Sequence, residues 1–145
     1  MTMIDAGIAG KSVIVTGGSR GIGRAIVDLF AAEGADVTLF YRSDAAAADA
    51  ALAAARSAAR AVAAIRVDIR DSAACRDAVE SVVERCGRVD ILVNNAGVIR
   101  DNPLSAFEDS DVADVLDTNV TGVFNVTRAV VPHMRERGYG RIVNI

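Results

Sequence analysis

The sequence predicts an α/β protein built on a doubly wound parallel sheet, and three observations lead to that fold class. Short runs of apolar and β-branched residues alternate with segments of helical periodicity. The connections between them are short, as they are where a helix links two parallel strands. A glycine-rich turn, residues 16–23, joins the first apolar run to the first helical segment. Right-handed crossovers then favour the strand order 3-2-1-4-5 in one domain, residues 1–145.

The expected elements follow from the spacing of apolar residues. Strands are expected at residues 12–16, 36–41, 63–67, 89–93 and 141–145. Helices are expected from the glycine-rich turn to Gly34, over the alanine-rich segment 45–61, over 72–86 and over 110–137. Three of these helices carry an apolar stripe. The stripe of the first helix is Ile22, Ile26, Leu29 and Phe30, and that of the third is Ala74, Ala78, Val79, Val82 and Val83. The stripe of the last helix is Val112, Val115, Leu116, Val123, Phe124, Val130 and Met134.

Capping residues and helix breakers set the expected helix ends. Asp44 caps the alanine-rich helix, and Asp71 or Ser72 caps the helix that runs to about Cys86. Gly34 and Gly87 end their helices. Within the long helix, Pro132 is expected to kink or fray the last turn.

Composition excludes several classes of protein. The chain has 145 residues, a formal net charge of −3, 52% hydrophobic and 24% charged residues, so neither disorder nor a basic nucleic-acid-binding surface is indicated. No apolar run has the length of a membrane span and no secretory signal is visible, so a small-molecule partner and a cytoplasmic location are expected. Cys75 and Cys86 are not spaced as metal ligands, and we expect core thiols and no metal. His133 is expected to be a surface or capping residue.

The glycine-rich turn is the candidate binding element. Gly17, Gly21 and Gly23 permit a tight turn, close approach of a ligand to the backbone, and close packing of helix on strand. The unpaired N–H groups and the dipole of the following helix favour an anion at the same place. An ordinary strand-to-helix turn is the alternative, but a second apolar strand completes a unit of about thirty residues, the length typical of nucleotide binding.

The predicted strand order places a crevice between the first and fourth strands. Ligands bind outside the carboxyl ends of the strands where the strand order reverses. The loops at this point are Gly17–Gly23 and Asn94–Gly97. The asparagines alone are also consistent with a plain turn, because asparagine tolerates unusual backbone angles.

These residues resemble the short-chain dehydrogenases/reductases. Four motifs carry the resemblance in order: Thr16-Gly-x-x-x-Gly21-x-Gly23, Asp68 after the third strand, Asn94-Asn-Ala-Gly97 after the fourth, and Asn119 in the long helix. The segment 10–145 is most similar to the 3-oxoacyl-(acyl carrier protein) reductases and related acetoacetyl-CoA or polyketide ketoreductases. The fold implied is a Rossmann domain, represented by its amino-terminal part and cut after the fifth strand.

The resemblance implies a set of site residues. Asp68 would bond the adenine amino group, Asn95 to Gly97 would line the adenosine ribose and central pocket, and Asn119 would be catalytic, holding a water at a local break in its helix. Asparagine is also a poor helix former, and a solvated surface residue is the alternative for Asn119. The full cofactor set is Thr16, Gly17, Gly18, Ser19, Arg20, Gly21, Ile22, Gly23, Tyr41, Arg42, Ser43, Asp68, Ile69, Asn95, Ala96 and Gly97.

The end of the second strand predicts a preference for NADP(H) over NAD(H). NAD-binding domains usually place a carboxylate there to hold the ribose hydroxyls. Tyr41-Arg42-Ser43 occupies that place instead, and Arg42 with Arg20 can meet a 2′-phosphate from two sides. Asp44 is close enough to compete, but we interpret it as a helix cap.

The resemblance also implies a mechanism that this chain does not complete. In the family a tyrosine, a lysine and a serine assist hydride transfer to a carbonyl, and they follow the fifth strand. The chain stops at Ile145, its only lysine is Lys11, and neither Tyr41 nor Tyr139 has a lysine four residues on. Two hypotheses stay open. In the first, the chain is the amino-terminal half of an NADPH-dependent ketone reductase, which is homo-oligomeric at full length and takes a small or acyl-carrier-bound substrate. In the second, the chain is a noncatalytic nucleotide-binding or interaction module.

Overall fold

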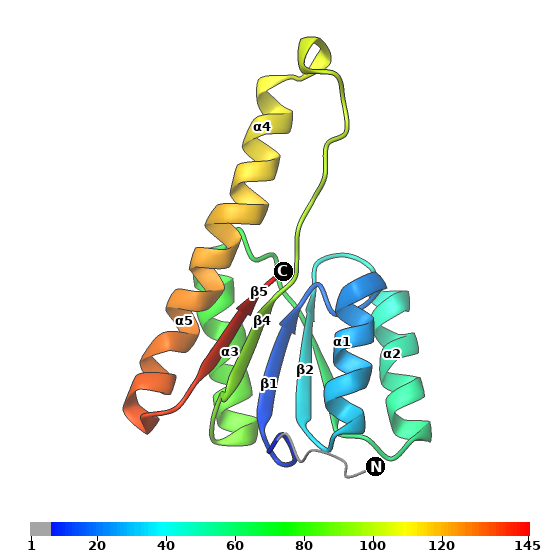
Figure 1. Cartoon of the computed structure of the whole chain (residues 1–145), viewed down its shortest axis with the longest axis vertical. Coiled ribbons are helices and arrows are strands. Elements are labelled where there is room, and N and C mark those ends of the chain that lie inside the picture. The colour runs from blue at the N-terminus through cyan, green and yellow to red at the C-terminus, as the bar shows by residue number, and fades with distance from the viewer. Residues whose placement is uncertain (1–6) are drawn as a thin grey trace, which may run out of the picture.

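The computed structural model describes residues 7–145 and contains a five-stranded parallel sheet (Figure 1). Its strand order is β3-β2-β1-β4-β5, so the predicted fold class and order are confirmed. The strands are β1 Ser12–Thr16, β2 Asp36–Tyr41, β3 Val62–Arg66, β4 Ile91–Asn94 and β5 Arg141–Asn144. The predicted boundaries differ by no more than two residues. The first six residues of the predicted domain lie outside the described part.

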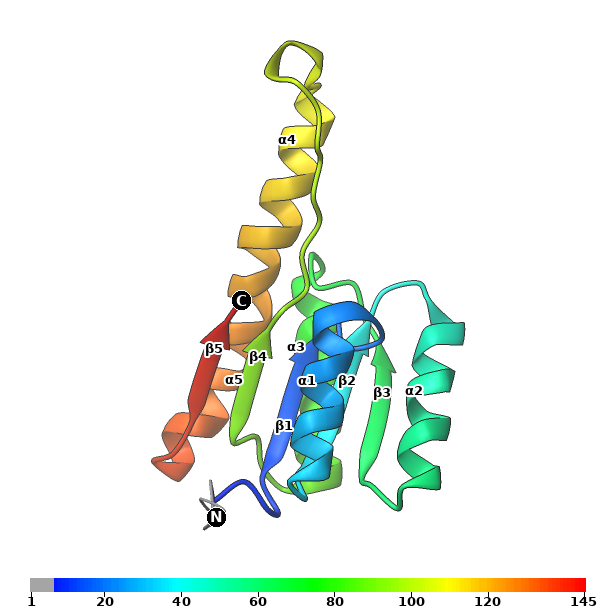
Figure 2. The ribbon, with the colours of Figure 1, turned by 45° about the vertical axis from the view of Figure 1, so that its right-hand side comes forward.

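Helices cover both faces of the sheet (Figure 2). One face carries α1 and α2, and the other carries α3 and α5. The helices are α1 Gly21–Ala32, α2 Ala45–Ser57, α3 Ser72–Cys86, α4 Asp109–Leu116 and α5 Gly122–Arg137, with a 3-10 turn at Leu104–Ala106 and a π-helical turn at Asp117–Thr121. Among the described residues, none of these helices is long and apolar enough to span a membrane.

The core consists of two clusters, one on each face of the sheet. Val13 and Val15 point to the α1 and α2 side, whereas Ile14 between them points to the α3 and α5 side. This alternation is the period of two of an extended chain. Because β1 is buried on both faces, all five of its residues are inaccessible, as is usual for the centre of a parallel sheet.

Helix α1 buries a different stripe from the predicted one. Gly23, Val27 and Ala31 face the sheet, whereas Ile22 and Leu29 are 67% and 63% exposed. The glycine and alanine let the helix axis approach the sheet closely, and this approach selects the face that is buried. Ile26 and Phe30 are partly buried and pack at the margin of the core.

Helix α2 ends four residues before the predicted boundary at residue 61. The amide of Arg60 bonds to the carbonyl of Ala55 and that of Ala59 to the carbonyl of Arg56, while Ala59 has a φ of 52°. This is the Schellman arrangement, which usually has glycine in the left-handed position. An alanine there gives no sequence signal inside an alanine-rich run, so the helix end was not predictable.

The long helix consists of α4, the π-helical turn and α5, which follow one another directly. Together with the preceding loop, its first part forms an arm, residues 98–121, that projects beyond the carboxyl ends of the strands (Figure 1). Within the predicted stripe only Val130 and Met134 are buried, and Phe124 is 70% exposed. The predicted periodicity is correct, and the stripe is largely exposed along the arm because no sheet lies beneath it.

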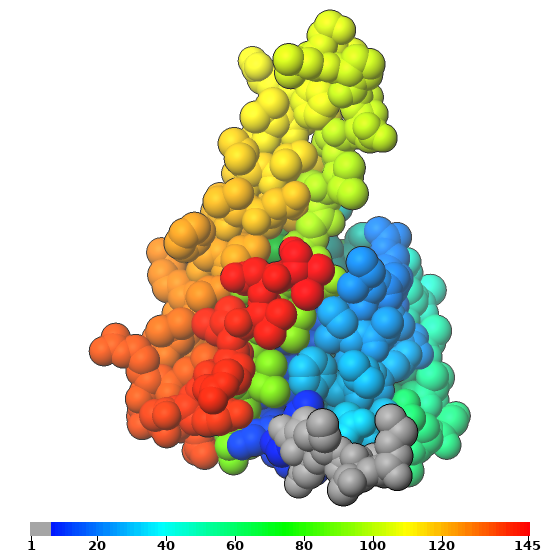
Figure 3. Space-filling view, viewed as in Figure 1, coloured from blue at the N-terminus to red at the C-terminus, as the bar shows by residue number. Residues whose placement is uncertain are grey.

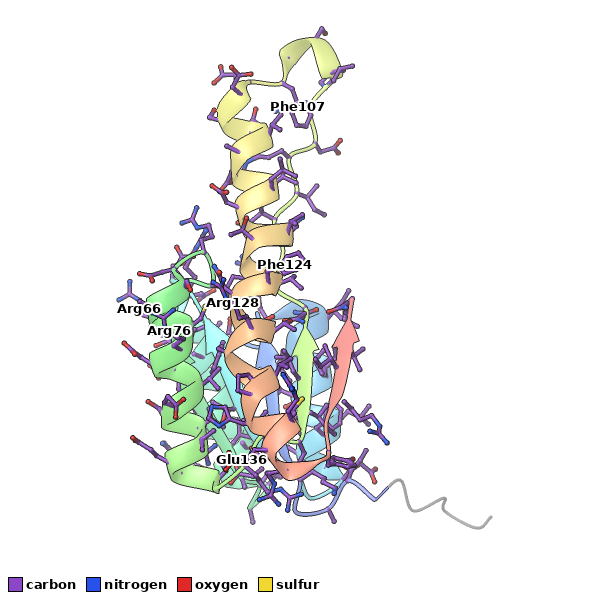
Figure 4. The ribbon with its side chains drawn as sticks, turned by 90° about the vertical axis from the view of Figure 1, so that its left-hand side faces the viewer. Arg66, Arg76, Phe107, Phe124, Arg128 and Glu136 are labelled. Carbon is purple, nitrogen blue, oxygen red and sulfur yellow. The ribbon has the colours of Figure 1, made fainter. Side chains whose placement is uncertain are left out.

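Helix α5 packs against α3 below the arm. Its buried residues are Gly122, Asn125, Val126, Val130 and Met134. At the top of this contact Arg76 and Arg128 both donate to the hydroxyl of Ser72, at 3.1 and 3.0 Å (Figure 4). Pro132 lies inside α5, which continues to Arg137, so the last turn does not fray there and only the alternative of a kink stays a prediction.

The two cysteines lie in or beside the core, and the histidine lies at the surface. Cys75 is fully buried and its thiol donates to the carbonyl of Ile69 at 3.4 Å, which confirms a core thiol. Cys86 is only half-buried. Burial raises the pKa of the Cys75 thiol to about 11. The ring of His133 contacts Glu80 at 3.1 Å on the outer side of the α3 and α5 pair, a surface position.

Candidate functional site

A cavity of about 350 Å³ lies at the carboxyl ends of the central strands. In the space-filling view the outline is notched between the base of the arm and the start of α1 (Figure 3). This volume is within the range of small-molecule sites. The cavity is lined by Gly17, Ser19, Arg20, Gly21, Ile22, Gly23, Phe40, Tyr41, Arg42, Ser43, Asp44, Val67, Asp68, Ile69, Asn95, Ala96, Gly97, Val98 and Thr118.

The structure brings most of the predicted cofactor residues together around this cavity. The two exceptions are Thr16 and Gly18, which do not line it. The hydroxyl oxygen of Thr16 accepts hydrogen bonds from the amides of Asn95 and Ala96, both at 3.0 Å. Gly18 packs on Val27 and Leu39, which leave no room for a Cβ. Thr16 therefore fixes the loop after β4, and Gly18 allows the turn to pack on the core, so both shape the cavity without lining it.

The three glycines of the turn meet separate demands. Gly17 and Gly21 have φ values of 65° and 56°, in the left-handed region that side chains disfavour. Gly23 is needed for a different reason, because a Cβ there would collide with the carbonyl oxygen of Gly17 and the side chain of Asn95. A Cβ on Gly21 would meet nothing within 4 Å, so this position faces open space in the cavity.

The first turn of α1 is available to an anion. Arg20 stands at the N-cap and makes no side-chain cap hydrogen bond. The amides of a helix start and the helix dipole favour negative charge. Because Gly21 leaves the approach open, a phosphate group fits at this end of the cavity. The residues present thus suit a diphosphate.

A second asparagine contact fixes the glycine turn to the loop after β4. The side-chain amide of Asn95 donates to the carbonyl of Thr16 at 3.1 Å and to that of Gly17 at 3.3 Å. Asn94 points the other way, and its amide donates to Thr127 and to Asn144 of β5. The two asparagines therefore join β1, β4, β5 and α5 at the edge where the cavity opens.

Arginines surround the end of β2. Arg42 lines the cavity with an exposed side chain, and its carbonyl accepts a hydrogen bond from Nε of Arg66 at 3.0 Å. Arg20 lies 3.9 Å from Asp44 across the cavity mouth. Asp44 also accepts the amide of Ala47 at 2.9 Å, so its predicted role as the α2 cap is confirmed.

Asp68 lines the cavity just after β3, the strand that pairs with β2, and is held by Arg70. The guanidinium contacts both carboxylate oxygens, and the closest distance, from Nη2 to Oδ2, is 2.6 Å. The hydrogen bond from Arg70 lowers the pKa of the Asp68 carboxyl, and partial burial opposes the shift. At neutral pH Asp68 is consequently an ionised acceptor on the cavity wall.

Asn119 does not line the cavity but fixes the arm next to it. Its amide nitrogen donates to the carbonyl of Val98 at 2.9 Å, and its Oδ1 accepts the amide of Val98 at 2.8 Å. It lies in the π-helical turn, and the neighbouring Thr118 does line the cavity. The side chain thus joins the π-helical turn to the loop after β4. Asn119 is exposed, as the alternative supposed, but its side chain is hydrogen-bonded to the chain itself.

Five lining residues were not among the predicted site residues. Phe40 and Val67 have the signal of ordinary strand or core residues. Asp44 was predicted only as a cap, and nothing in the sequence sets Val98 and Thr118 apart. Val98 and Thr118 line the cavity because the π-helical turn is bonded to the loop after β4, a long-range contact that local spacing does not reveal.

A doubly wound sheet with a glycine-rich turn, and with a cavity where its strand order reverses, defines a Rossmann-type protein. The short chain dehydrogenase family model matches residues 11–145. The chain therefore belongs to the short chain dehydrogenase family, as its motifs predicted.

Curated relatives include 3-oxoacyl-[acyl-carrier-protein] reductases named FabG. The chain is 37% identical over 142 residues to the protein of Chlamydia pneumoniae and 38% identical over 144 residues to that of Escherichia coli K12. These alignments cover 98% and 94% of this chain but 57% and 54% of the relatives. The chain spans about half the length of the curated relatives it matches.

Solved structures have the same fold. A short chain dehydrogenase from Burkholderia cenocepacia J2315 in complex with NADP superposes with a TM-score of 0.86 at 41% identity, covering 94% of this chain and 55% of that one. A putative short-chain dehydrogenase/reductase from Burkholderia xenovorans gives a TM-score of 0.90 at 39% identity, covering 94% and 56%.

Proposed function

We propose that the cavity binds NADP(H) and that the chain is the cofactor-binding half of a ketone reductase. The observation that carries the proposal is the end of β2, where Arg42 faces the cavity in the place of the usual carboxylate. A guanidinium pairs well with a phosphate, so this position favours the 2′-phosphate of NADP(H). The Burkholderia cenocepacia structure in complex with NADP supports the same cofactor.

Different lining residues would hold different parts of the cofactor. The first turn of α1 and Gly21 would hold the diphosphate, and Arg42 with Arg20 would hold the 2′-phosphate. Asp68 would accept a hydrogen bond from the adenine amino group, with Ile69 beside it. The ribose would lie against Asn95 to Gly97. When bound, the nicotinamide would supply the hydride that reduces a carbonyl.

A 3-oxoacyl thioester, carried by an acyl carrier protein or by coenzyme A, is the substrate we propose. The names of the FabG relatives support this class. Both polar atoms of the Asn119 side chain bond to Val98. We therefore assign Asn119 a share in catalysis through the position of the π-helical turn, with its side chain holding that turn in place.

The alternative is a noncatalytic nucleotide-binding module, and the positions of the tyrosines favour it for the 145 residues alone. The ring of Tyr139 lies between Lys11 and Arg141, 4.4 and 4.9 Å from these cations, at the opposite end of the sheet. Tyr41 lines the cavity at the end of β2, beside Arg42. Tyr139 meets Lys11 outside the cavity, and Tyr41 in the cavity lining has no lysine among the other lining residues, so we expect no reduction of acetoacetyl-CoA by the purified, mass-verified chain. Measurable NADPH oxidation with this substrate would rule out the alternative.

Cofactor titration tests the proposal. We expect the chain to bind NADPH at least about tenfold more tightly than NADH, because charge-assisted hydrogen bonds to a phosphate are worth this much. Arg42→Ala should remove most of the difference, whereas Arg56→Ala, which removes an exposed charge near the far end of α2, should preserve it. Equal affinities, or tighter NADH binding that Arg42→Ala leaves unchanged, would contradict the proposal.

A further inference from the structure

Arg70 lies between the cavity and the arm and uses all three guanidinium nitrogens. Its Nε and Nη2 contact the carboxylate of Asp68, and its Nη1 donates to Oδ1 of Asp114 in α4 at 3.1 Å. One side chain thus links a residue of the cavity wall to a helix that is separate from the sheet. The sequence separation between Arg70 and Asp114 is 44 residues.

The contacts of Asp68 leave one acceptor position of its carboxylate free. A carboxylate offers about four lone-pair positions. Oδ1 accepts the amide of Arg70 and its Nε, both at 3.0 Å, and Oδ2 accepts Nη2 at 2.6 Å, with Nε 3.1 Å away. Because the single Nε hydrogen is shared between Oδ1 and Oδ2, three donor hydrogens meet these four positions, and neither oxygen is singled out as the open one. Arg70 therefore fixes the orientation of the carboxylate and leaves it able to accept one further donor.

The other end of Arg70 is held by the arm. Asp114 is shared with Arg100, whose Nη2 contacts the second carboxylate oxygen, and Nε of Arg100 lies 3.6 Å from Asp111. Helix α4 has no buried residue, so its position depends on polar contacts of this kind. The side chain of Asp114 is 21% exposed, whereas that of Arg70 is 38% exposed and is held chiefly by its two carboxylate partners.

We propose that Arg70, held by Asp114 of α4, is a positioning residue that orients the carboxylate of Asp68 toward the amino group of the adenine. The inference rests on the proposed function, because it assumes that Asp68 faces the adenine. It goes further by naming the residue that makes Asp68 selective for adenine and by coupling that selectivity to the arm.

Comparison of NADPH with its hypoxanthine analogue tests the inference, because hypoxanthine carries an oxygen where adenine carries the amino group. We expect the unaltered chain to bind NADPH at least about tenfold more tightly than the analogue, the value of a hydrogen bond to a charged acceptor. In Arg70→Gln the ratio of the two affinities should fall to within about threefold of one. Asp114→Asn should lower the ratio in part, and the double variant should match Arg70→Gln.

The ratio of the two affinities distinguishes a positioning role from partial unfolding, because unfolding weakens the binding of NADPH and of its analogue alike. Arg76→Gln is the matched control, since Arg76 is an exposed arginine of α3 outside the cavity that bonds Ser72. It should leave the ratio unchanged. If the unaltered chain discriminates and Arg70→Gln still does, the inference is overturned and the proposed function stands. Equal binding of the two cofactors by the unaltered chain would overturn both the Asp68 contact and the inference.

Discussion

At the scale of single residues, Gly23 carries the strictest demand in the cavity wall. A methyl group there would push apart the Gly17 carbonyl and the Asn95 amide, which together shape the turn. We expect Gly23→Ala to lower the free energy of unfolding by about 1–3 kcal/mol, the usual cost of overpacking. We also expect it to abolish measurable NADPH binding. Urea unfolding and fluorescence titration measure the two effects.

Gly87→Ala provides the comparison for Gly23→Ala. Gly87 ends α3 with a φ of 71° and has open space around it, and it precedes β4 at the amino ends of the strands, the edge of the sheet opposite the cavity. Its replacement should cost about 1–2 kcal/mol through left-handed strain alone and leave NADPH affinity unchanged. Normal NADPH binding by Gly23→Ala would show that the turn tolerates a side chain and that our account of it is wrong.

Asp68 gives the protein a pH-dependent contribution to stability. Its pKa is lowered in the folded chain, chiefly by the hydrogen bond from Arg70. A carboxyl of this kind adds stability that is present above the unfolded-state pKa of about 3.9 and lost as pH falls through the lower folded value. Urea unfolding between pH 6 and pH 2 should therefore show a smaller acid-induced loss for Arg70→Gln than for the unaltered chain. Identical pH profiles would mean that the contact is too solvent-screened to count.

The site was predictable to the extent that local sequence determines it. Gly17 and Gly21 were found because the backbone of a tight strand-to-helix turn restricts which residues can stand there, and Asp68 was found through the resemblance to the family. Arg70 and Asp114 were missed, because a contact across 44 residues depends on where the arm lies, which no local pattern specifies.

At the scale of elements, the π-helical turn and Asn119 fix the arm. Asn119→Ala removes both hydrogen bonds to Val98 and should lower the free energy of local opening by about 1–2 kcal/mol. We expect faster amide hydrogen exchange over residues 98–108, with the exchange of β1 unchanged. Asn119→Asp keeps the acceptor but loses the donor, so its effect should be smaller. Unchanged exchange in both variants would show that other contacts hold the arm.

Helical periodicity predicted the existence of each helix better than its buried face. In α1 the close approach at Gly23 turned the helix so that Ile22 faces solvent. In α4 the stripe has the right period but no sheet beneath it. Burial is a property of the assembled layers, and a single helix does not specify which neighbour it will meet.

At the scale of the whole molecule, strand order followed from crossover handedness alone, and the structure confirms it. Within the described residues β5 pairs with β4 only, and Ile142 and Val143 are about 40% exposed. Phe124 adds a large apolar side chain at the start of α5 (Figure 4). An open strand edge beside apolar surface favours association.

We therefore expect the 145-residue chain to associate as its concentration rises, measured by light scattering. Phe124→Ser should reduce the association while changing the free energy of unfolding by no more than about 0.5 kcal/mol, as is usual for exposed positions. Ala53→Ser, at an exposed position on α2, should have no effect on association. A monodisperse monomer at all concentrations would show that the edge and the α5 surface are harmless.

A crystal structure of the chain with NADPH would show where each part of the cofactor lies. We expect the diphosphate at the first turn of α1, the 2′-phosphate within hydrogen-bond distance of Arg42, and the adenine amino group on the carboxylate of Asp68 with Arg70 still in place. A cofactor bound elsewhere, or bound in this cavity with the adenine away from Asp68 and the 2′-phosphate away from Arg42, would contradict it.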